Sequence, residues 1–195
     1  AFTISGPDNY SKTVKYSEFT EGKYTLNDLP VGEYTVSEDT ATAAVENYTL
    51  TVTGNGATAA VTKDATASLT IANTYTKDVG SLKITKTFEG TPAGADLSGL
   101  SFTINDGTTD TVVTYADFPD GAYTITNIPV GTTYTVEETN AGTLIANYSL
   151  SADSVTEGTA TIAKDTEAVI ALTNKYTQDV GSLKITKTFE GTPAG

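Results

Sequence analysis

Three polar side chains fall on the apolar faces of what otherwise look like ordinary strands. In "GSLKITKTFEG", the alternation of side chains places Lys86 on the same face as Leu82. The same test places Glu138 on the inward face of "YTVEE" and Asn174 on the inward face of "IALTNKY". A buried charge or amide without a partner costs several kcal/mol. We therefore expect these three side chains to meet inside the fold.

Two kinds of chemistry are open to such a trio. The first is a buried ion pair between Lys86 and Glu138, with the amide of Asn174 completing the hydrogen bonds. The second is covalent, because burial favours a neutral amine beside a neutral acid, and a neutral amine is a nucleophile. Lys86 would attack the side-chain carbonyl of Asn174 while Glu138 polarises it and passes a proton to the departing ammonia. The product would be an amide crosslink between two strands.

The elements that position these residues recur along the chain. The stretch "AFTI" at the start is similar to "SFTI" at 101–104, and "LPVGEYTVSED" is similar to "IPVGTTYTVEET". The sequence therefore repeats with a period of about 100 residues, a common domain size. In this frame, residues 77–177 form a complete domain and residues 1–76 a domain lacking its first strand. Residues 178–195 are then the first strand of a following or neighbouring domain. We expect the domains to stack end to end because their linkers are short.

The pattern within the complete domain predicts an all-β fold. Turn signals such as "DG" and "PVG" separate short stretches rich in Thr, Val, Ile and Tyr, with no helical periodicity between them. Such spacing is typical of an immunoglobulin-like β-sandwich. The predicted strands lie near residues 82–89, 101–105, 111–115, 122–127, 132–138, 146–152, 159–163 and 167–175.

The incomplete domain carries the acid and the amide of the trio but not the lysine strand. Glu38 and Asn73 occupy the positions of Glu138 and Asn174, whereas a second copy of the lysine strand, with Lys187, comes at 181–195. We expect that strand to fill the missing position in a neighbouring copy, head to tail, with Lys187 beside Glu38 and Asn73. The alternative is a continuous repeat array, in which the neighbour belongs to the same polypeptide.

Composition excludes several functions. The net charge of -13 disfavours nucleic-acid and anionic membrane partners, and no apolar run is long enough to span a bilayer. The chain has no Cys or His, and its acidic turns do not match the spacing of a calcium loop, so we expect neither a metal nor a cofactor. No nucleophile–histidine pair or phosphate-binding glycine loop is present, so we do not expect a turnover enzyme.

The motifs "LKITKTF", "VGTTYTVEET" and "ALTNKY" together resemble Cna B-type domains of Gram-positive surface adhesins and pilins. The resemblance implies a prealbumin-like β-sandwich, a cell-surface and wall-associated setting, and an intramolecular isopeptide bond. It places the crosslinking lysine on Lys86, the catalytic acid on Glu138 and the acceptor on Asn174. The usual "A-P-x-G-Y" after the glutamate motif is replaced here by "NAGTLIANY", and no L-P-x-T-G sorting signal is present.

Two functions follow from these observations. The first is a structural segment of a stalk, adhesin or filament, which predicts near-interchangeable units without a distinctive exposed patch. The second is a binding module that grips a host protein or glycan through the loops at the ends of the sandwich, which predicts a divergent, aromatic-rich loop. The close similarity of the repeats favours the structural role.

Overall fold

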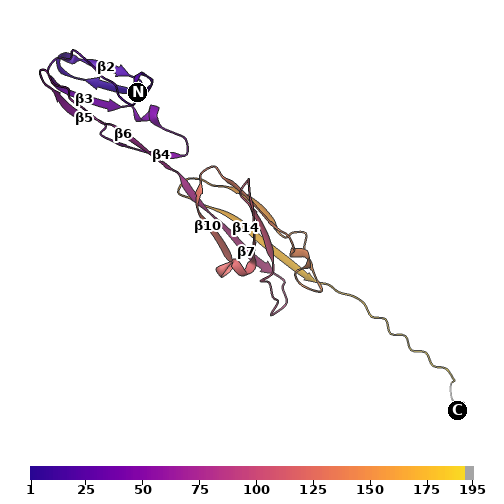
Figure 1. The fold of residues 1–195 in the computed structure, drawn as a ribbon. Helices are drawn as coiled ribbons and strands as arrows, with labels where there is room; N and C mark the ends of the chain where they lie inside the picture. The colour runs from indigo at the N-terminus through magenta and orange to yellow at the C-terminus, as the bar shows by residue number, and fades with distance from the viewer. Residues whose placement is uncertain (192–195) are drawn as a thin grey trace. The chain divides into compact units, whose positions relative to one another are not determined.

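The computed structural model describes residues 1–191. The chain divides into two compact units, which we call unit 1 (Ala1–Val79) and unit 2 (Gly80–Gly195) (Figure 1). Strands dominate both units, and the helical elements are short. The all-β prediction is confirmed.

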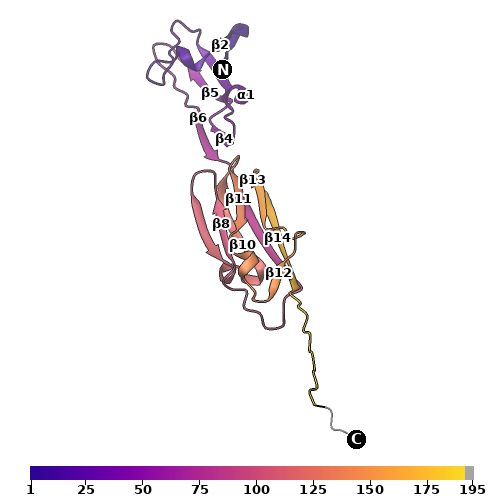
Figure 2. The ribbon, with the colours of Figure 1, turned by 90° about the vertical axis from the view of Figure 1, so that its right-hand side faces the viewer.

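Unit 2 is a sandwich of two four-stranded sheets (Figure 2). One sheet has the order β10-β7-β14-β12 and the other the order β13-β11-β8-β9. The strands of the first sheet are β7 (Val79–Glu89), β10 (Ala122–Pro129), β12 (Tyr148–Leu150) and β14 (Glu167–Gln178). Those of the second are β8 (Ser101–Asn105), β9 (Asp110–Thr114), β11 (Thr133–Glu138) and β13 (Glu157–Thr161). Each strand predicted from the sequence of this unit is present.

The core of unit 2 lies between the two sheets and is built by alternation along each strand. On β7, Leu82 and Ile84 are fully buried and Lys86 follows them inward. On β14, Ile170 and Leu172 are buried and Asn174 continues the same face. Phe102 of β8 stacks on Phe118, and both rings belong to the core. The period of two therefore carries the polar trio into the interior together with its apolar neighbours.

The strands that carry Lys86 and Asn174 are direct neighbours. β7 and β14 pair in parallel, and Lys86 lies opposite Leu172, two residues before Asn174. The labelled β7 and β14 can be followed side by side in Figure 1. The other strand pairs with a recorded register in unit 2 are antiparallel. The first and last strands of the unit are thus held in one sheet.

Unit 1 has two sheets of unequal size. The larger has the order β2-β1-β3-β5 and the smaller contains β4 and β6. The strands of the larger sheet are β1 (Phe2–Ser5), β2 (Ser11–Val14), β3 (Gly32–Glu38) and β5 (Ala57–Val61). The smaller sheet has β4 (Tyr48–Thr53) and β6 (Ala72–Lys77), and the short helix α1 (Thr40–Ala43) follows β3.

Two segments that form strands in unit 2 do not form them in unit 1. "KYTLNDLP" corresponds to β10, yet its residues 24–30 are in no strand. Residues 65–71 correspond to the first half of β14, and they too are in no strand, so β6 begins only at Ala72. In unit 2 both partners of β7 are the equivalents of these segments. Among the described residues, unit 1 has no counterpart of β7, and its two flanking segments consequently have no strand to pair with at that position.

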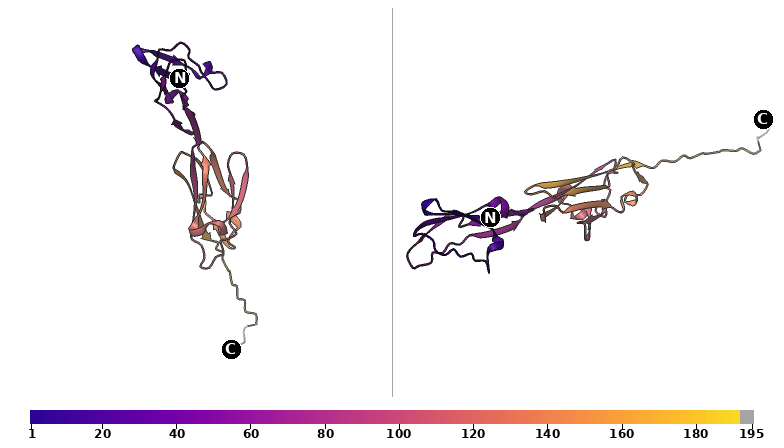
Figure 3. Two further views of the ribbon diagram at one scale, coloured as in Figure 1. Left: turned by 60° about the vertical axis from the view of Figure 1, so that its left-hand side comes forward. Right: turned by 90° about the horizontal axis from the view of Figure 1, so that it is seen from above.

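The second copy of the lysine strand behaves differently from the first. Residues 179–191 form no strand, and Figure 3 draws them without an arrow. Leu183 and Ile185 are more than 80% exposed, at 86% and 84%. The strand predicted at 181–195 is therefore not formed over its described part, because no other strand of this chain pairs with it there, and residues 192–195 lie outside the described residues.

Candidate functional site: a buried Lys–Glu–Asn cluster

Lys86 and Glu138 meet across the two sheets of unit 2. Lys86 projects inward from the middle of β7, and Glu138 is the last residue of β11. Nζ of Lys86 lies 2.6 Å from Oε1 of Glu138, and both side chains are 0% exposed. The amine is not aligned with the carboxylate as a hydrogen bond requires, so the contact is one of charge and proximity. The predicted meeting of these two residues is present in the structure.

Asn174 completes the cluster from β14, beside the lysine strand. The residue is fully buried. Its Nδ2 donates a long hydrogen bond of 3.4 Å to the hydroxyl of Tyr176, which in turn donates to the backbone oxygen of Ala141 at 2.9 Å. Its Oδ1 has no hydrogen-bond partner among the described residues. A buried carbonyl oxygen without a donor is costly, and such an exception calls for a physical explanation.

Burial acts on the two charged groups in opposite directions. It lowers the pKa of Lys86 below the ordinary lysine value, although the carboxylate of Glu138 opposes this effect. It raises the pKa of Glu138, against the opposing effects of Lys86 and of the Asn174 side chain. Both shifts favour a neutral amine beside a neutral acid. The ring of Phe88, whose centroid lies 5.0 Å from Nζ of Lys86, favours the charged amine instead.

The cluster has the parts that amide formation requires. A neutral Lys86 would be a nucleophile, Asn174 offers an uncommitted carbonyl, and Glu138 can give and take a proton beside the amine. The same geometry also fits a buried ion pair without covalent chemistry. The two states differ in whether one ammonia is lost.

Unit 1 contains the acid and the amide in an open setting. Glu38 is 9% exposed, and its Oε1 accepts a 2.8 Å hydrogen bond from Nδ2 of Asn73. Its Oε2 has no hydrogen-bond partner in the described part of the chain. Asn55 fixes the backbone of Glu38 from both sides, with hydrogen bonds of 2.6 and 3.2 Å. Asn73, expected on a core face, is exposed because the segment before it forms no strand and no lysine strand covers it.

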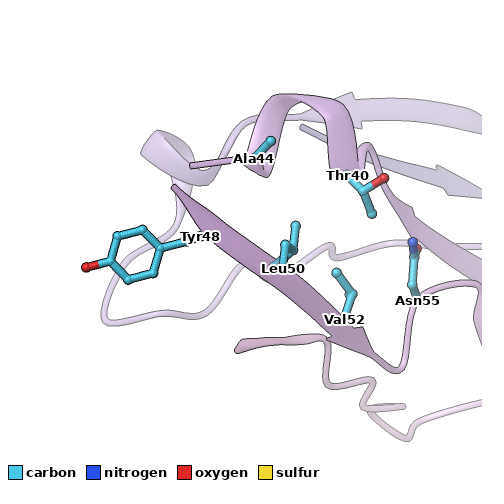
Figure 4. A pocket seen from close by; sticks show the side chains of 6 residues that line it. All are labelled: Thr40, Ala44, Tyr48, Leu50, Val52 and Asn55. Carbon is cyan, nitrogen blue, oxygen red and sulfur yellow. The ribbon is translucent and has the colours of Figure 1, made fainter. Parts of the chain in front are cut away.

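A hollow next to this open site shows that the small sheet of unit 1 is incompletely packed. Leu50 and Val52 point from β4 toward α1, with Thr40 and Asn55 across the opening (Figure 4). Ala44 and Tyr48 also line the hollow. The apolar inner face of β4 is therefore partly uncovered.

The family model described as "Domain of unknown function (DUF5979)" matches residues 2–76 and 82–177. The chain belongs to this family. The two matched DUF5979 segments fall in unit 1 and in unit 2. No curated protein sequence matches the chain.

Solved structures of Gram-positive pilins and adhesins are similar in fold to this DUF5979 chain. The minor pilin GBS52 of Streptococcus agalactiae is 16% identical with a TM-score of 0.37, over 96% of this chain and 85% of its own. The C-terminal fragment of the pilus adhesin SpaC of Lactobacillus rhamnosus GG is 14% identical with a TM-score of 0.44, over 94% and 90%. At this level of similarity, neither protein assigns a function to the chain.

Other similar structures come from longer proteins. An adhesin of Mobiluncus mulieris, described as containing intramolecular disulfide, isopeptide and ester bond cross-links, is 14% identical with a TM-score of 0.40. The match covers 75% of this chain and 58% of that one. The chain spans only 32% of the Bacillus anthracis TIE protein, to which it is 19% identical with a TM-score of 0.35.

Sequence reasoning missed several residues around the DUF5979 sites. Alternation along "IALTNKY" puts Tyr176 on the same face as Asn174, but it does not indicate that the hydroxyl lies beside the acceptor amide. Its bond to Ala141 and the bonds of Asn55 to Glu38 join residues far apart in sequence, so no local pattern indicates them. The recurrence of the tyrosine two positions after the acceptor, as Tyr75 and Tyr176, was the available signal.

Two further findings bear on other kinds of site. Within residues 1–191, no group of three or more acidic, Cys or His side chains is arranged to hold a metal ion. The helices described by the structure are all too short or too polar to cross a membrane.

Proposed function

We propose that this chain is a structural segment of a bacterial cell-surface stalk, adhesin or filament, whose unit 2 is locked by a self-formed amide bond between Lys86 and Asn174. The observation that carries the proposal is the buried 2.6 Å approach of Lys86 to Glu138, beside an acceptor amide whose oxygen has no hydrogen-bond partner within residues 1–191. The resemblance to Cna B-type domains supports the isopeptide bond and an extracellular, wall-associated setting.

The bond would form in a single turnover without any cofactor. The lone pair of neutral Nζ of Lys86 attacks Cγ of Asn174, while protonated Glu138 donates to Oδ1. Glu138 then relays one proton from the attacking amine to Nδ2. The bond from Cγ to Nδ2 breaks as the carbonyl reforms, the proton on Oδ1 returns to Glu138, and the nitrogen leaves as ammonia. One C–N bond replaces another, nothing is oxidised or reduced, and Glu138 ends as it began.

The position of this bond suits a mechanical role. The chain enters unit 2 through β7 and leaves its folded part through β14, and these strands are parallel neighbours. A pulling force would pass along β7 to Lys86, across the bond, and out through Asn174 toward Gln178. Residues 87–173 would then bear no load. Hydrogen bonds alone would leave the two strands free to slide and the unit free to unravel.

Force spectroscopy tests this function directly. Unit 2, pulled through its ends, is expected not to extend beyond its terminal segments. Lys86→Ala should unfold with the length of the released residues 87–173, whereas Lys83→Ala, which changes the outward lysine of the same strand, should behave like the original. An original chain that extends as far as Lys86→Ala contradicts the mechanical role.

The same proposal extends to unit 1, which we infer to be a strand acceptor. The segments at 24–30 and 65–71 correspond to the two strands that flank β7 in unit 2, and they are in no strand in the described part of the chain. Tyr75 is 40% exposed, whereas its counterpart Tyr176 is 5% exposed. An incoming strand would cover this face and restore two ladders of hydrogen bonds.

The occupant we propose is the segment 181–190 of a second copy. Its sequence is identical to 80–89, the strand that fills this position in unit 2. It is unpaired and exposed in its own chain. The register of unit 2, where Lys86 lies opposite the residue two positions before Asn174, would set Lys187 opposite the residue two positions before Asn73. Lys187 would then supply the partner that Oε2 of Glu38 lacks.

A further inference from the structure

The hydroxyl of Tyr176 already uses its proton in a hydrogen bond. It donates its only proton to the backbone oxygen of Ala141 at 2.9 Å, in a buried position. Burial raises the pKa of Tyr176, so the phenol keeps that proton across the ordinary pH range. Toward Asn174 the hydroxyl can therefore only accept a hydrogen bond.

Because the hydroxyl of Tyr176 can only accept a hydrogen bond from Asn174, it determines which end of the amide faces the tyrosine. Only Nδ2 carries protons, and it lies 3.4 Å from the hydroxyl. Oδ1 must then point to the other side of the amide, where it has no partner among the described residues. The carbonyl oxygen is the atom that an acid must protonate when an amine attacks the amide.

In unit 1 the tyrosine does not hold the amide. Tyr75 also donates to a backbone oxygen, that of Ala43 at 2.7 Å, but it is exposed. Asn73 instead turns Nδ2 toward Glu38 and donates to it at 2.8 Å. Such a hydrogen bond stabilises a charged carboxylate.

We propose that Tyr176 is a positioning residue for crosslinking: its hydroxyl, held by Ala141, accepts from Nδ2 of Asn174 and so leaves the carbonyl oxygen of that amide without a hydrogen-bond partner among the described residues. The inference rests on the proposed Lys86–Asn174 bond and adds to it the group that orders the acceptor. Tyr176 itself exchanges no atom with the reactants.

The test measures the intact mass of the chain over time after cell-free synthesis is stopped, and thereby follows the loss of ammonia. The measurement is repeated across a range of pH. Tyr176→Phe should slow the loss by about tenfold, the effect of one hydrogen bond to the reacting group, without moving the pH midpoint. Tyr75→Phe, the matched change in unit 1, should leave the rate unchanged. If Tyr176→Phe loses ammonia at the original rate, the inference is overturned. It is also overturned if the pH midpoint of the rate shifts, because such a shift indicates that the site has loosened and that water reaches Glu138.

Repeating the measurement in a chain that carries Asn174→Asp separates a positioning role of Tyr176 from structural support. In Asn174→Asp the two acceptor oxygens are equivalent, and the bond forms with loss of water instead of ammonia. Adding Tyr176→Phe should then have little effect on the rate, whereas equal slowing in both backgrounds overturns the inference. A chain with the original residues that never loses ammonia contradicts the proposed function itself, which distinguishes that failure from a failure of Tyr176 alone.

Discussion

Lys86 and Glu138 approach to 2.6 Å in the interior of unit 2, each with a side chain wholly shielded from solvent. They come from different sheets, so the contact exists only once the sandwich has closed. Any chemistry between them is therefore conditional on folding, and an unfolded chain would not crosslink. Five consequences can be measured.

Replacing the acid should stop the reaction while leaving the fold. Glu138→Gln keeps the shape of the side chain but removes the group that gives and takes protons, so crosslinking should slow by at least about a hundredfold. Glu137→Gln alters the exposed neighbour on the same strand and should have no effect. Intact mass measured over time after synthesis distinguishes the two. Equal rates in both variants would show that Glu138 is not the acid.

The rate of crosslinking should depend on pH in a bell shape. The reactive state has a neutral Lys86 and a protonated Glu138. The rate therefore falls at low pH as the amine gains a proton, and at high pH as the acid loses one. Burial lowers the first pKa from 10.5 and raises the second from 4.5, so the maximum should lie between these values. A rate that rises steadily up to pH 10.5 would show that Glu138 is not needed in its protonated form.

Lys86→Ala should make the stability of unit 2 dependent on pH. Without the amine, burial is the largest effect on Glu138 and only the Asn174 side chain opposes it, so the folded pKa of Glu138 stays above 4.5. A group with a raised folded pKa binds more protons when folded, so its contribution is fully present below pH 4.5 and is lost as pH rises through the folded pKa. Thermal melting should show this fall in Lys86→Ala, and the double variant with Glu138→Gln should abolish it. A flat profile for Lys86→Ala contradicts the assignment.

The same variant should be less stable than the original chain at every pH. A crosslink that closes the loop between residues 86 and 174 restricts the unfolded chain and contributes about 4 kcal/mol. Lys83→Ala lacks this effect and provides the control. Chemical denaturation of the two variants gives the difference in their free energies of unfolding. Equal stability would show that unit 2 has no crosslink.

The strand acceptor in unit 1 predicts self-association of the chain. Concentrated samples should form a ladder on denaturing gels, with tryptic peptide 64–77 joined to 185–195 through Asn73 and Lys187. Leu183→Asp should abolish the ladder because it charges the inward face of the incoming strand, whereas Lys184→Ala on the outward face should not. A chain that stays monomeric at all concentrations contradicts the proposed strand acceptor in unit 1. The same branched peptide found in a chain of monomer mass also contradicts it, because the bond would then lie within one copy.

Part of the site could be predicted from the sequence because the pleat of a strand fixes which side chains share a face. Alternation placed Lys86, Glu138 and Asn174 inward, and the structure buries all three. The fold class followed from short strands and turn signals. Their partners could not be predicted in this way, since pairing joins residues distant in the sequence. The bond of Tyr176 to Ala141 is of this kind.

Alternation also misjudged unit 1, for a related reason. It placed Asn73 on a core face, but a face is buried only where another layer covers it. The absence of a lysine strand among residues 1–79 removes the cover and leaves segment 65–71 unpaired. Local pattern predicts the direction of a side chain, whereas its burial depends on strands elsewhere.

Peptide mapping of the folded chain tests the central claim most directly. Trypsin cleaves after free lysines, so a Lys86–Asn174 bond should protect Lys86 and yield one branched product, in which residues 84–164 are joined to residues 165–175. Its mass should be lower than the sum of the two peptides by one ammonia. Recovery of residues 84–86, 87–164 and 165–175 as three separate peptides of full mass, from protein that was folded before digestion, would contradict the bond.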